Sequence, residues 1–340
     1  MQKRSLFVFA GLACAVAATC VLARSDAMLP LWPYGTTSAA RAAAELPGGE
    51  PVFAALRKAN APLHLADTQL TFTPAQAAAP YAGVDWYPDA HPPMPELVSH
   101  GRKADGVLAC ALCHHPDGYG RPENANIRGL AVDYIVRQME GFKNGERTSA
   151  DPQKSNTRLM IAAAKGLTHD EMVEVASYYG GMRATESYER VVESATAPKI
   201  WSEANGATFA LAVPNAGSES FSQAIVEIPE DAVQAEVYRN PREIYVAYVP
   251  PGSIARGKVL ATRGGGKTTA CAACHGSNFA GTEIAPPLAG RSPSYIGRQL
   301  FDIQRGARRN APAMIPVAAQ LTPDDIIDLA AYLGSLGSKG

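Results

Sequence analysis

The sequence has few cysteines and no excess of charge of either sign. Both features restrict the classes of function that the protein can have. Only six cysteines occur in 340 residues, and two of them, Cys14 and Cys20, lie in an apolar N-terminal run. The other four form two Cys-x-x-Cys-His motifs, which leaves no cysteine for the disulfides common in exported proteins. With 31 Lys and Arg against 32 Asp and Glu the net charge is −1, which argues against a nucleic-acid partner.

Residues 1–27 are typical of a secretory signal peptide. Lys3 and Arg4 precede an uncharged run over 5–23, and small residues suited to cleavage follow. This pattern predicts export to the periplasm. The same run is about long enough to span a bilayer, so an uncleaved anchor that attaches the N-terminus to the membrane is the alternative interpretation.

The motifs CALCH (110–114) and CAACH (271–275) indicate attachment of haem c. In each, two cysteines would form thioether bonds to the porphyrin and the histidine would ligate the iron. A thioredoxin-like redox pair needs neither a trailing histidine nor a second copy, and zinc would need all four cysteines to converge. We therefore predict two covalently bound haem c groups, held by Cys110, Cys113, His114, Cys271, Cys274 and His275. His115 is interpreted as a partly exposed residue beside the first haem.

A repeat becomes visible when the two motifs are superposed. RGLAVDYIVRQMEGFKNGER (128–147) then falls on AGRSPSYIGRQLFDIQRGAR (289–308). The matched pairs are Tyr134 and Tyr295, Arg137 and Arg298, Gln138 and Gln299, Gly145 and Gly306, and Arg147 and Arg308. The period is a whole domain, so the chain contains one helical domain twice.

Helix signals occur at the same places in both repeats. Apolar spacing and N-terminal caps predict helices over about 131–144 and 169–180 in the first repeat. They predict helices over about 293–306 and 323–335 in the second. Thr168, followed three residues later by Glu171, has the form of a capping box.

The second repeat limits what could bind the other side of its iron. After His275 there is no further histidine, and the only methionine is Met314. The repeat alignment places Met160 on Met314, on a loop before the final helix. We therefore predict Met160 and Met314 as the distal ligands, with His114 and His275 opposite. A thioether favours ferrous iron and leaves no open position, which suits outer-sphere electron transfer.

These features resemble the tandem class I dihaem cytochromes c of the periplasmic two-domain type. The resemblance covers 97–182 and 252–340, about half of the chain. It implies a mainly α fold with two class I domains. It also implies that a backbone carbonyl at Pro287 steadies the second histidine. The first repeat has Asn126 at that position, a departure that leaves the support of His114 an open question.

Two segments have no counterpart in the minimal two-domain form. Residues 28–96 are rich in proline, alanine and aromatics and are predicted to be an irregular N-terminal extension. Residues 183–251 contain short β-branched runs that end at proline and predict a small β-containing insert. This insert holds 5 basic and 10 acidic residues, whereas 252–340 holds 10 and 5. Either the two pack together, or Arg305, Arg308 and Arg309 form a docking rim for an acidic redox partner.

The sequence thus predicts a dihaem electron carrier and no enzyme. It would relay single electrons from a dehydrogenase or quinol-oxidising complex to an oxidase or another cytochrome. The alternatives are a dihaem peroxidase or a thiosulfate-oxidising cytochrome, which need an iron with an open, histidine or cysteine position. A third alternative is a cytochrome subunit fixed to a dehydrogenase, which differs in partnership but not in chemistry.

Overall fold

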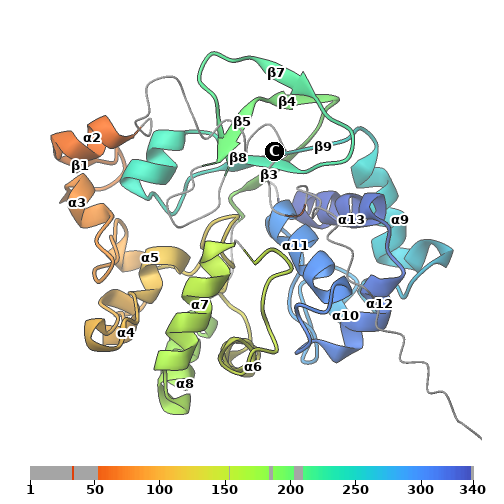
Figure 1. Ribbon diagram of the computed structural model, residues 1–340, viewed down its shortest axis with the longest axis horizontal. Helices are drawn as coiled ribbons and strands as arrows, with labels where there is room; N and C mark the ends of the chain where they lie inside the picture. The colour runs from red at the N-terminus through yellow and green to blue at the C-terminus, as the bar shows by residue number, and fades with distance from the viewer. Residues whose placement is uncertain (1–32, 34–52, 153, 184–186, 203–209, 338–340) are drawn as a thin grey trace, which may run out of the picture. The chain divides into compact units, whose positions relative to one another are not determined.

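A computed structural model (Figure 1) describes residues 33, 53–152, 154–183, 187–202 and 210–337. All of these belong to one compact unit, residues 31–340. The predicted signal peptide or anchor at 1–27 lies outside the described residues. Along the described part of the chain, no helix combines the length and apolarity needed to cross a membrane.

The first repeat is a set of helices around one apolar core (Figure 1). The helices predicted at 131–144 and 169–180 are confirmed, and Thr168 forms the predicted capping box with Glu171. The core includes Met139 and Met172. The elements are α4 (Glu96–Ser99), η3 (Lys103–Asp105), α5 (Cys110–His114), α6 (Val132–Lys143), α7 (Ser155–Gly166) and α8 (His169–Gly180).

The second repeat has the same plan and confirms the helices predicted at 293–306 and 323–335. Helices α9 and α13 pack closely. A Cβ atom at Gly257 would lie only 1.9 Å from the carbonyl oxygen of Asp328, so this crossing requires glycine. The elements are α9 (Ser253–Arg263), η5 (Gly264–Gly266), α10 (Ala272–His275), α11 (Pro293–Gln304), η6 (Pro312–Met314), α12 (Ile315–Ala319) and α13 (Pro323–Ser335).

The segment between the repeats contains β structure, as predicted. Strands β3, β9 and β8 form a sheet in that order, in which β9 is parallel to β3 and antiparallel to β8. Strand pairs β4–β7 and β5–β6 are antiparallel. The elements are β3 (Glu189–Glu193), β4 (Thr196–Pro198), β5 (Ile200–Ser202), β6 (Ala210–Ala212), β7 (Ser218–Ser220), β8 (Val226–Pro229), the π-helical turn η4 (Gln234–Tyr238) and β9 (Tyr245–Val249).

The N-terminal extension shares a hydrophobic core with this β segment. Trp86 and Leu63 pack in one cluster with Leu211 and Val237. The indole Nε1 of Trp86 also donates to the carbonyl oxygen of Tyr238 at 2.8 Å. We call the described residues of the two segments, 53–90 and 187–249, the accessory unit. Its N-terminal part holds α2 (Ala54–Ala59), β1 (Leu63–His64), β2 (Thr71–Phe72), α3 (Pro74–Ala77) and η2 (Pro88–Ala90).

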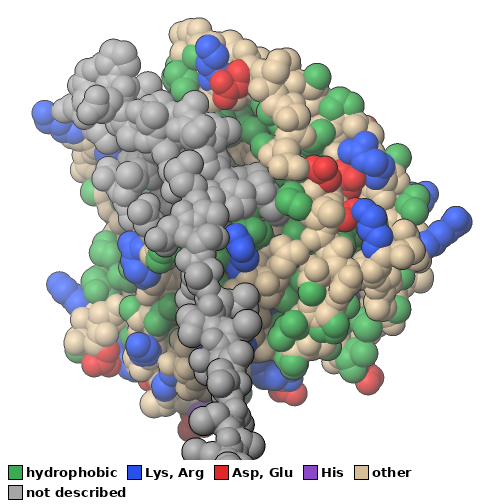
Figure 2. Space-filling view, turned by 45° about the vertical axis from the view of Figure 1, so that its right-hand side comes forward, with side chains coloured by type: hydrophobic (Ala, Val, Ile, Leu, Met, Phe, Trp, Pro, Cys, Tyr) green, Lys and Arg blue, Asp and Glu red, His purple; other side chains and the backbone are tan. Residues whose placement is uncertain are grey.

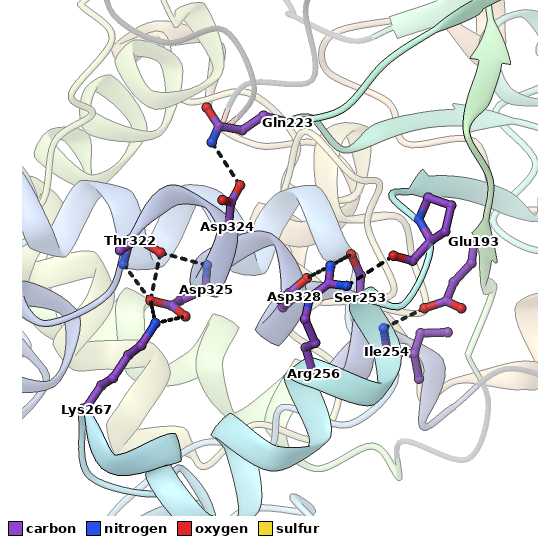
Figure 3. A network of polar contacts seen from close by, with 11 residues as sticks. Glu193, Gln223, Ser253, Ile254, Arg256, Lys267, Thr322, Asp324, Asp325 and Asp328 are labelled. Atoms are coloured by element: carbon purple, nitrogen blue, oxygen red, sulfur yellow. Dashed lines mark hydrogen bonds and ion pairs between the residues drawn. The ribbon is translucent and has the colours of Figure 1, made fainter.

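The accessory unit is also bonded to the second repeat (Figure 3). The Glu193 carboxylate accepts the backbone N–H of Ile254 at 2.7 Å, and Gln223 Nε2 donates to Asp324 at 2.8 Å. Glu227 accepts the Ser292 hydroxyl at 2.9 Å. Two acidic side chains of the insert are therefore used for internal packing against neutral donors of the second repeat.

Matched residues of the two repeats meet across the interface between them. Arg147 donates to the Tyr295 hydroxyl at 3.2 Å and to Gln299 at 2.9 Å. Arg308 donates to the Tyr134 hydroxyl at 2.8 Å. The backbones of Arg147 and Arg308 form an isolated antiparallel bridge. Because the two repeats carry the same residues at matched positions, the arginine of each repeat contacts the tyrosine of the other.

We predict that Tyr134→Phe and Tyr295→Phe each destabilise the protein by about 1–2 kcal/mol, because each removes an acceptor from a buried arginine of the other repeat. Urea unfolding measures the change. Tyr81→Phe, outside this interface, is the control. Equal stability of all three variants and the unmodified protein would contradict the role given to this interface.

A second prediction concerns Glu243, which is 7% exposed and accepts the backbone N–H of Asp231 at 2.6 Å. Burial raises the pKa of Glu243 from an ordinary value near 4.5 to about 7. Between these values the folded chain holds a proton that the unfolded chain has lost, so stability falls as pH rises from about 4.5 to about 7.

Glu243→Gln should remove this contribution. The variant should therefore gain stability relative to the unmodified protein when the pH is raised from 4 to 8, a range of about four pH units around the titration. Unfolding in urea at several pH values tests this, with Glu230→Gln at an exposed carboxylate as the control. A stability difference that does not change with pH would show that Glu243 titrates normally.

Candidate haem sites

The first motif histidine is held by a backbone carbonyl. Nδ1 of His114 lies 2.8 Å from the carbonyl oxygen of Ala125. Because a carbonyl only accepts, Nδ1 carries the proton and Nε2 keeps a free lone pair. Burial lowers the pKa of His114, which keeps the ring neutral. A neutral ring with a free Nε2 is what an iron ligand requires.

The second histidine is held in the same way. Nδ1 of His275 lies 2.7 Å from the carbonyl oxygen of Pro286, and burial lowers the pKa of this ring too. The expectation that Pro287 supplies this carbonyl was wrong by one residue. The Pro287 carbonyl instead accepts Nε of Arg291 at 2.6 Å.

The open question about the support of His114 is answered by its hydrogen bond to Ala125. Ala125 and Pro286 occupy matched positions, one residue before Asn126 and Pro287 in their repeats. The main-chain carbonyl is available whatever side chain follows it, so asparagine in place of proline does not remove the hydrogen bond.

A cavity in the first repeat brings the predicted residues together. Cys110, Cys113, His114 and Met160 all line it. Met160 lies within α7 (Ser155–Gly166), so its predicted place on a loop was wrong. Met139 on α6 lines the same cavity and is a second sulfur that the sequence comparison treated as core.

The wall of this cavity includes residues of the second repeat. Tyr295 and Gln299 on α11 line it together with Arg147. Next to Arg147, the buried Nε of Arg308 has no hydrogen-bond partner among the described residues. A haem carries two propionate carboxylates, and buried guanidinium groups are suitable donors for them. An apolar cavity with two thiols, a neutral imidazole, a thioether and basic side chains therefore fits a haem.

In the second repeat the motif forms the short helix α10. Cys271 is partly buried, whereas Cys274 is exposed. Met314 ends η6, directly before α12, and is partly buried. The two predicted methionine ligands thus lie at aligned positions but in different local structures, an α-helix for Met160 and a 3₁₀ turn for Met314.

The four motif cysteines form no disulfide in the described part of the chain. Burial raises the pKa of Cys110 to about 12 and that of Cys271 to about 11, so both stay protonated. Among the residues that the structure describes, no cluster of three or more His, Cys, Asp and Glu side chains is arranged to hold a metal ion.

His115 is buried, which corrects the expectation of a partly exposed ring. Its backbone has φ of 59°, and the matched Gly276 has φ of 83°. The chain turns sharply after each motif in a conformation that favours glycine, so His115 does not continue the helix that carries His114.

The sequence did not reveal which side chains contact the first motif from positions far along the chain. Arg239 of the accessory unit donates to the carbonyl oxygen of Leu112, inside the CALCH motif. Asn124 Nδ2 donates to the carbonyl oxygen of Cys113 at 3.2 Å. No local pattern marks Arg239, because it lies 127 residues beyond Leu112 in the chain.

Comparison with known proteins agrees with this geometry. The family model described as Cytochrome c matches residues 254–337. The chain is 38% identical over 76 residues to cytochrome c-554(548) of Halomonas halodenitrificans, which covers 22% of this chain and 86% of that protein. It is 24% identical over 249 residues to the thiosulfate dehydrogenase electron acceptor of Stutzerimonas stutzeri, covering 72% of this chain and 86% of that protein.

One solved structure also shows limited similarity to this chain. The crystal structure of reduced recombinant cytochrome c4 from Pseudomonas stutzeri matches with a TM-score of 0.43 and 20% identity. The match covers 69% of this chain and 97% of that one.

Proposed function

The chain belongs to the cytochrome c family, and on that premise we propose that Met160 and Met314 complete the coordination of its two covalently bound haem c groups. It is a dihaem electron-transfer protein with two class I domains in tandem. Each haem, when bound, supplies an iron that cycles between the ferric and ferrous states. The residues of the chain attach, orient and shield it.

One observation carries the assignment of the ligands. In both repeats a neutral histidine directs Nδ1 at a main-chain carbonyl, 2.8 Å away for His114 and 2.7 Å for His275. Such a hydrogen bond fixes the tautomer and the ring orientation of a metal ligand. In the first repeat, Met160 shares the cavity with this histidine and with both motif cysteines.

We propose that the protein is a carrier and not an enzyme. A methionine at each iron leaves no position for peroxide or another substrate. Both repeats offer a methionine, and outside the N-terminal run every cysteine is used in a motif. A dihaem peroxidase or a thiosulfate-oxidising cytochrome would need an open, histidine or cysteine position instead.

The partners we propose are redox proteins of the periplasm. The donor would be a dehydrogenase or a quinol-oxidising complex, and the acceptor an oxidase or another cytochrome. The name of the Stutzerimonas stutzeri relative supports a dehydrogenase as donor. A lasting complex with that dehydrogenase, or attachment of the N-terminus to the membrane, would be detected by co-purification and by fractionation.

The docking rim expected at Arg305, Arg308 and Arg309 is corrected by the structure. Arg308 is 7% exposed and bonds Tyr134 across the interface between the repeats, so a partner cannot reach it. Arg305 and Arg309 are exposed. Figure 2 shows basic, acidic and apolar side chains interspersed over the described part of one face of the molecule.

Replacement of each methionine by leucine tests the ligands, because leucine keeps the volume but removes the sulfur. Met160→Leu and Met314→Leu should each remove about half of the ferric sulfur-to-iron absorption band, since each affects one of two haems. Each should also open one haem to carbon monoxide. Redox-titrated absorption spectra, with and without carbon monoxide and peroxide, measure both effects.

Met139→Leu is the matched control for the first site, because Met139 lines the same cavity. It should leave both bands intact. Loss of the band in Met139→Leu and not in Met160→Leu would reassign the first ligand. Rapid reaction of the unmodified protein with peroxide would favour an enzyme.

A further inference from the structure

The loops that follow the two haem motifs match in sequence position but differ in exposure. In the first, over 110–123, Ala111, Arg121 and Glu123 are buried. At the matched positions in the second, over 271–284, Ala272 is partly buried and Thr282 and Ile284 are exposed. Ile284 is 80% exposed. The two loops thus occupy matched positions but differ in their exposure to solvent.

The accessory unit causes the difference at the first loop. Arg239 bonds the carbonyl oxygen of Leu112 within the motif. Arg121 forms ion pairs with Glu236 of the accessory unit and, at 2.9 Å, with Glu123 of its own loop. All three of these charged side chains are at most 4% exposed. Separating them would leave buried charges unpaired, which is costly, so the cover is firmly held.

The second loop instead exposes an apolar side chain, as do helix α9 and the start of α12. Ile284, Val259 and Ile315 are all at least 43% exposed. The Thr282 hydroxyl donates to the carbonyl oxygen of Cys274 at 2.7 Å, which holds the loop against the motif. Helix α9, which carries Val259, packs against the motif helix α10. Exposed apolar side chains beside a redox centre suit a transient protein contact.

The exposed charges in this part of the chain are mostly positive. From 252 to 322 the exposed acidic side chain is Glu283, since Asp302 is buried. Basic side chains that are exposed in the same range are Arg256, Lys258, Arg263, Lys267, Arg305 and Arg309. Two of them are paired with acidic residues of α13, Arg256 with Asp328 and Lys267 with Asp325, each at 2.8 Å. Such an excess attracts and orients a partner with an acidic surface.

We propose that the accessory unit closes the motif loop of the N-terminal haem site, so that an acidic one-electron redox protein docks on the motif loop of the C-terminal site. This rests on the proposed carrier function and identifies the C-terminal domain as the one that receives the electron. The reduced partner loses one electron and the C-terminal centre gains it, while no bond forms or breaks. The docking surface comprises residues 256–267 and 271–284.

Reduced plastocyanin of the acidic type serves as the probe, since it is a one-electron copper donor. Hydrogen–deuterium exchange of the holoprotein should show protection by plastocyanin in peptides that cover 256–267 and 271–284. Peptides that cover 110–123 should show none. Protection at 110–123 equal to that at 271–284, or no protection at either loop, would overturn the proposal.

Charge variants give a second readout. Lys258→Glu combined with Arg263→Gln should lower the rate constant of reduction by plastocyanin about tenfold at low ionic strength, and less at high salt. Lys103→Glu combined with Lys165→Gln makes the same charge change at exposed residues of the N-terminal domain. This control should change the rate less than about twofold. An equal loss in both double variants would contradict the assigned docking surface.

Reduction by ascorbate distinguishes a wrong docking site from a wrong carrier function. It is a small reductant that needs no docking surface, and it should reduce both haems in every variant. Failure of ascorbate to reduce the unmodified protein would count against the carrier function itself. If ascorbate reduces the protein normally but plastocyanin protects 110–123, only the proposed docking site is contradicted and the carrier function still stands.

Discussion

The hydrogen bonds that Arg147 and Arg308 make across the interface keep the two haem domains in a single arrangement. Both side chains are 7% exposed, and each donates to a tyrosine of the other repeat. A buried donor that loses its acceptor costs about 1–3 kcal/mol, so a relative shift of the domains would break several such bonds together. The interface therefore has one favourable register.

This register has a direct consequence for the first haem site. Helix α11 belongs to the second repeat, yet Tyr295, Arg298 and Gln299 on it line the cavity of the first. The contacts across the interface therefore also fix part of the wall of the first site. A carrier benefits from such rigidity, because electron transfer between fixed centres needs little rearrangement of the protein.

The accessory unit changes access to the sites without changing their ligands. Its Glu236 forms a buried ion pair with Arg121 of the first motif loop. The duplicated domains thus keep equivalent histidine–carbonyl pairs and acquire different surroundings. The motif loop over 110–123 is therefore covered, and the matched loop over 271–284 is more exposed.

Much of the candidate site could be predicted because its chemistry is local. The spacing in CALCH and CAACH places two sulfurs and an imidazole on one short helical turn, whatever the rest of the chain does. The cap at Thr168 and the proline after Ser292 mark helix starts within a few residues. The aligned Met160 and Met314 follow from comparing the chain with itself.

What the sequence by itself determined is the pair of haem c attachment motifs, the mainly helical repeats and the presence of a β-containing insert. Only the tertiary structure decided that Arg308 is buried, that the extension and the insert share one core, and that Arg239 covers Leu112. The physical reason is the range of the interactions. Motifs and caps depend on neighbours a few residues apart, whereas burial depends on segments more than a hundred residues apart, whose contact no local pattern records.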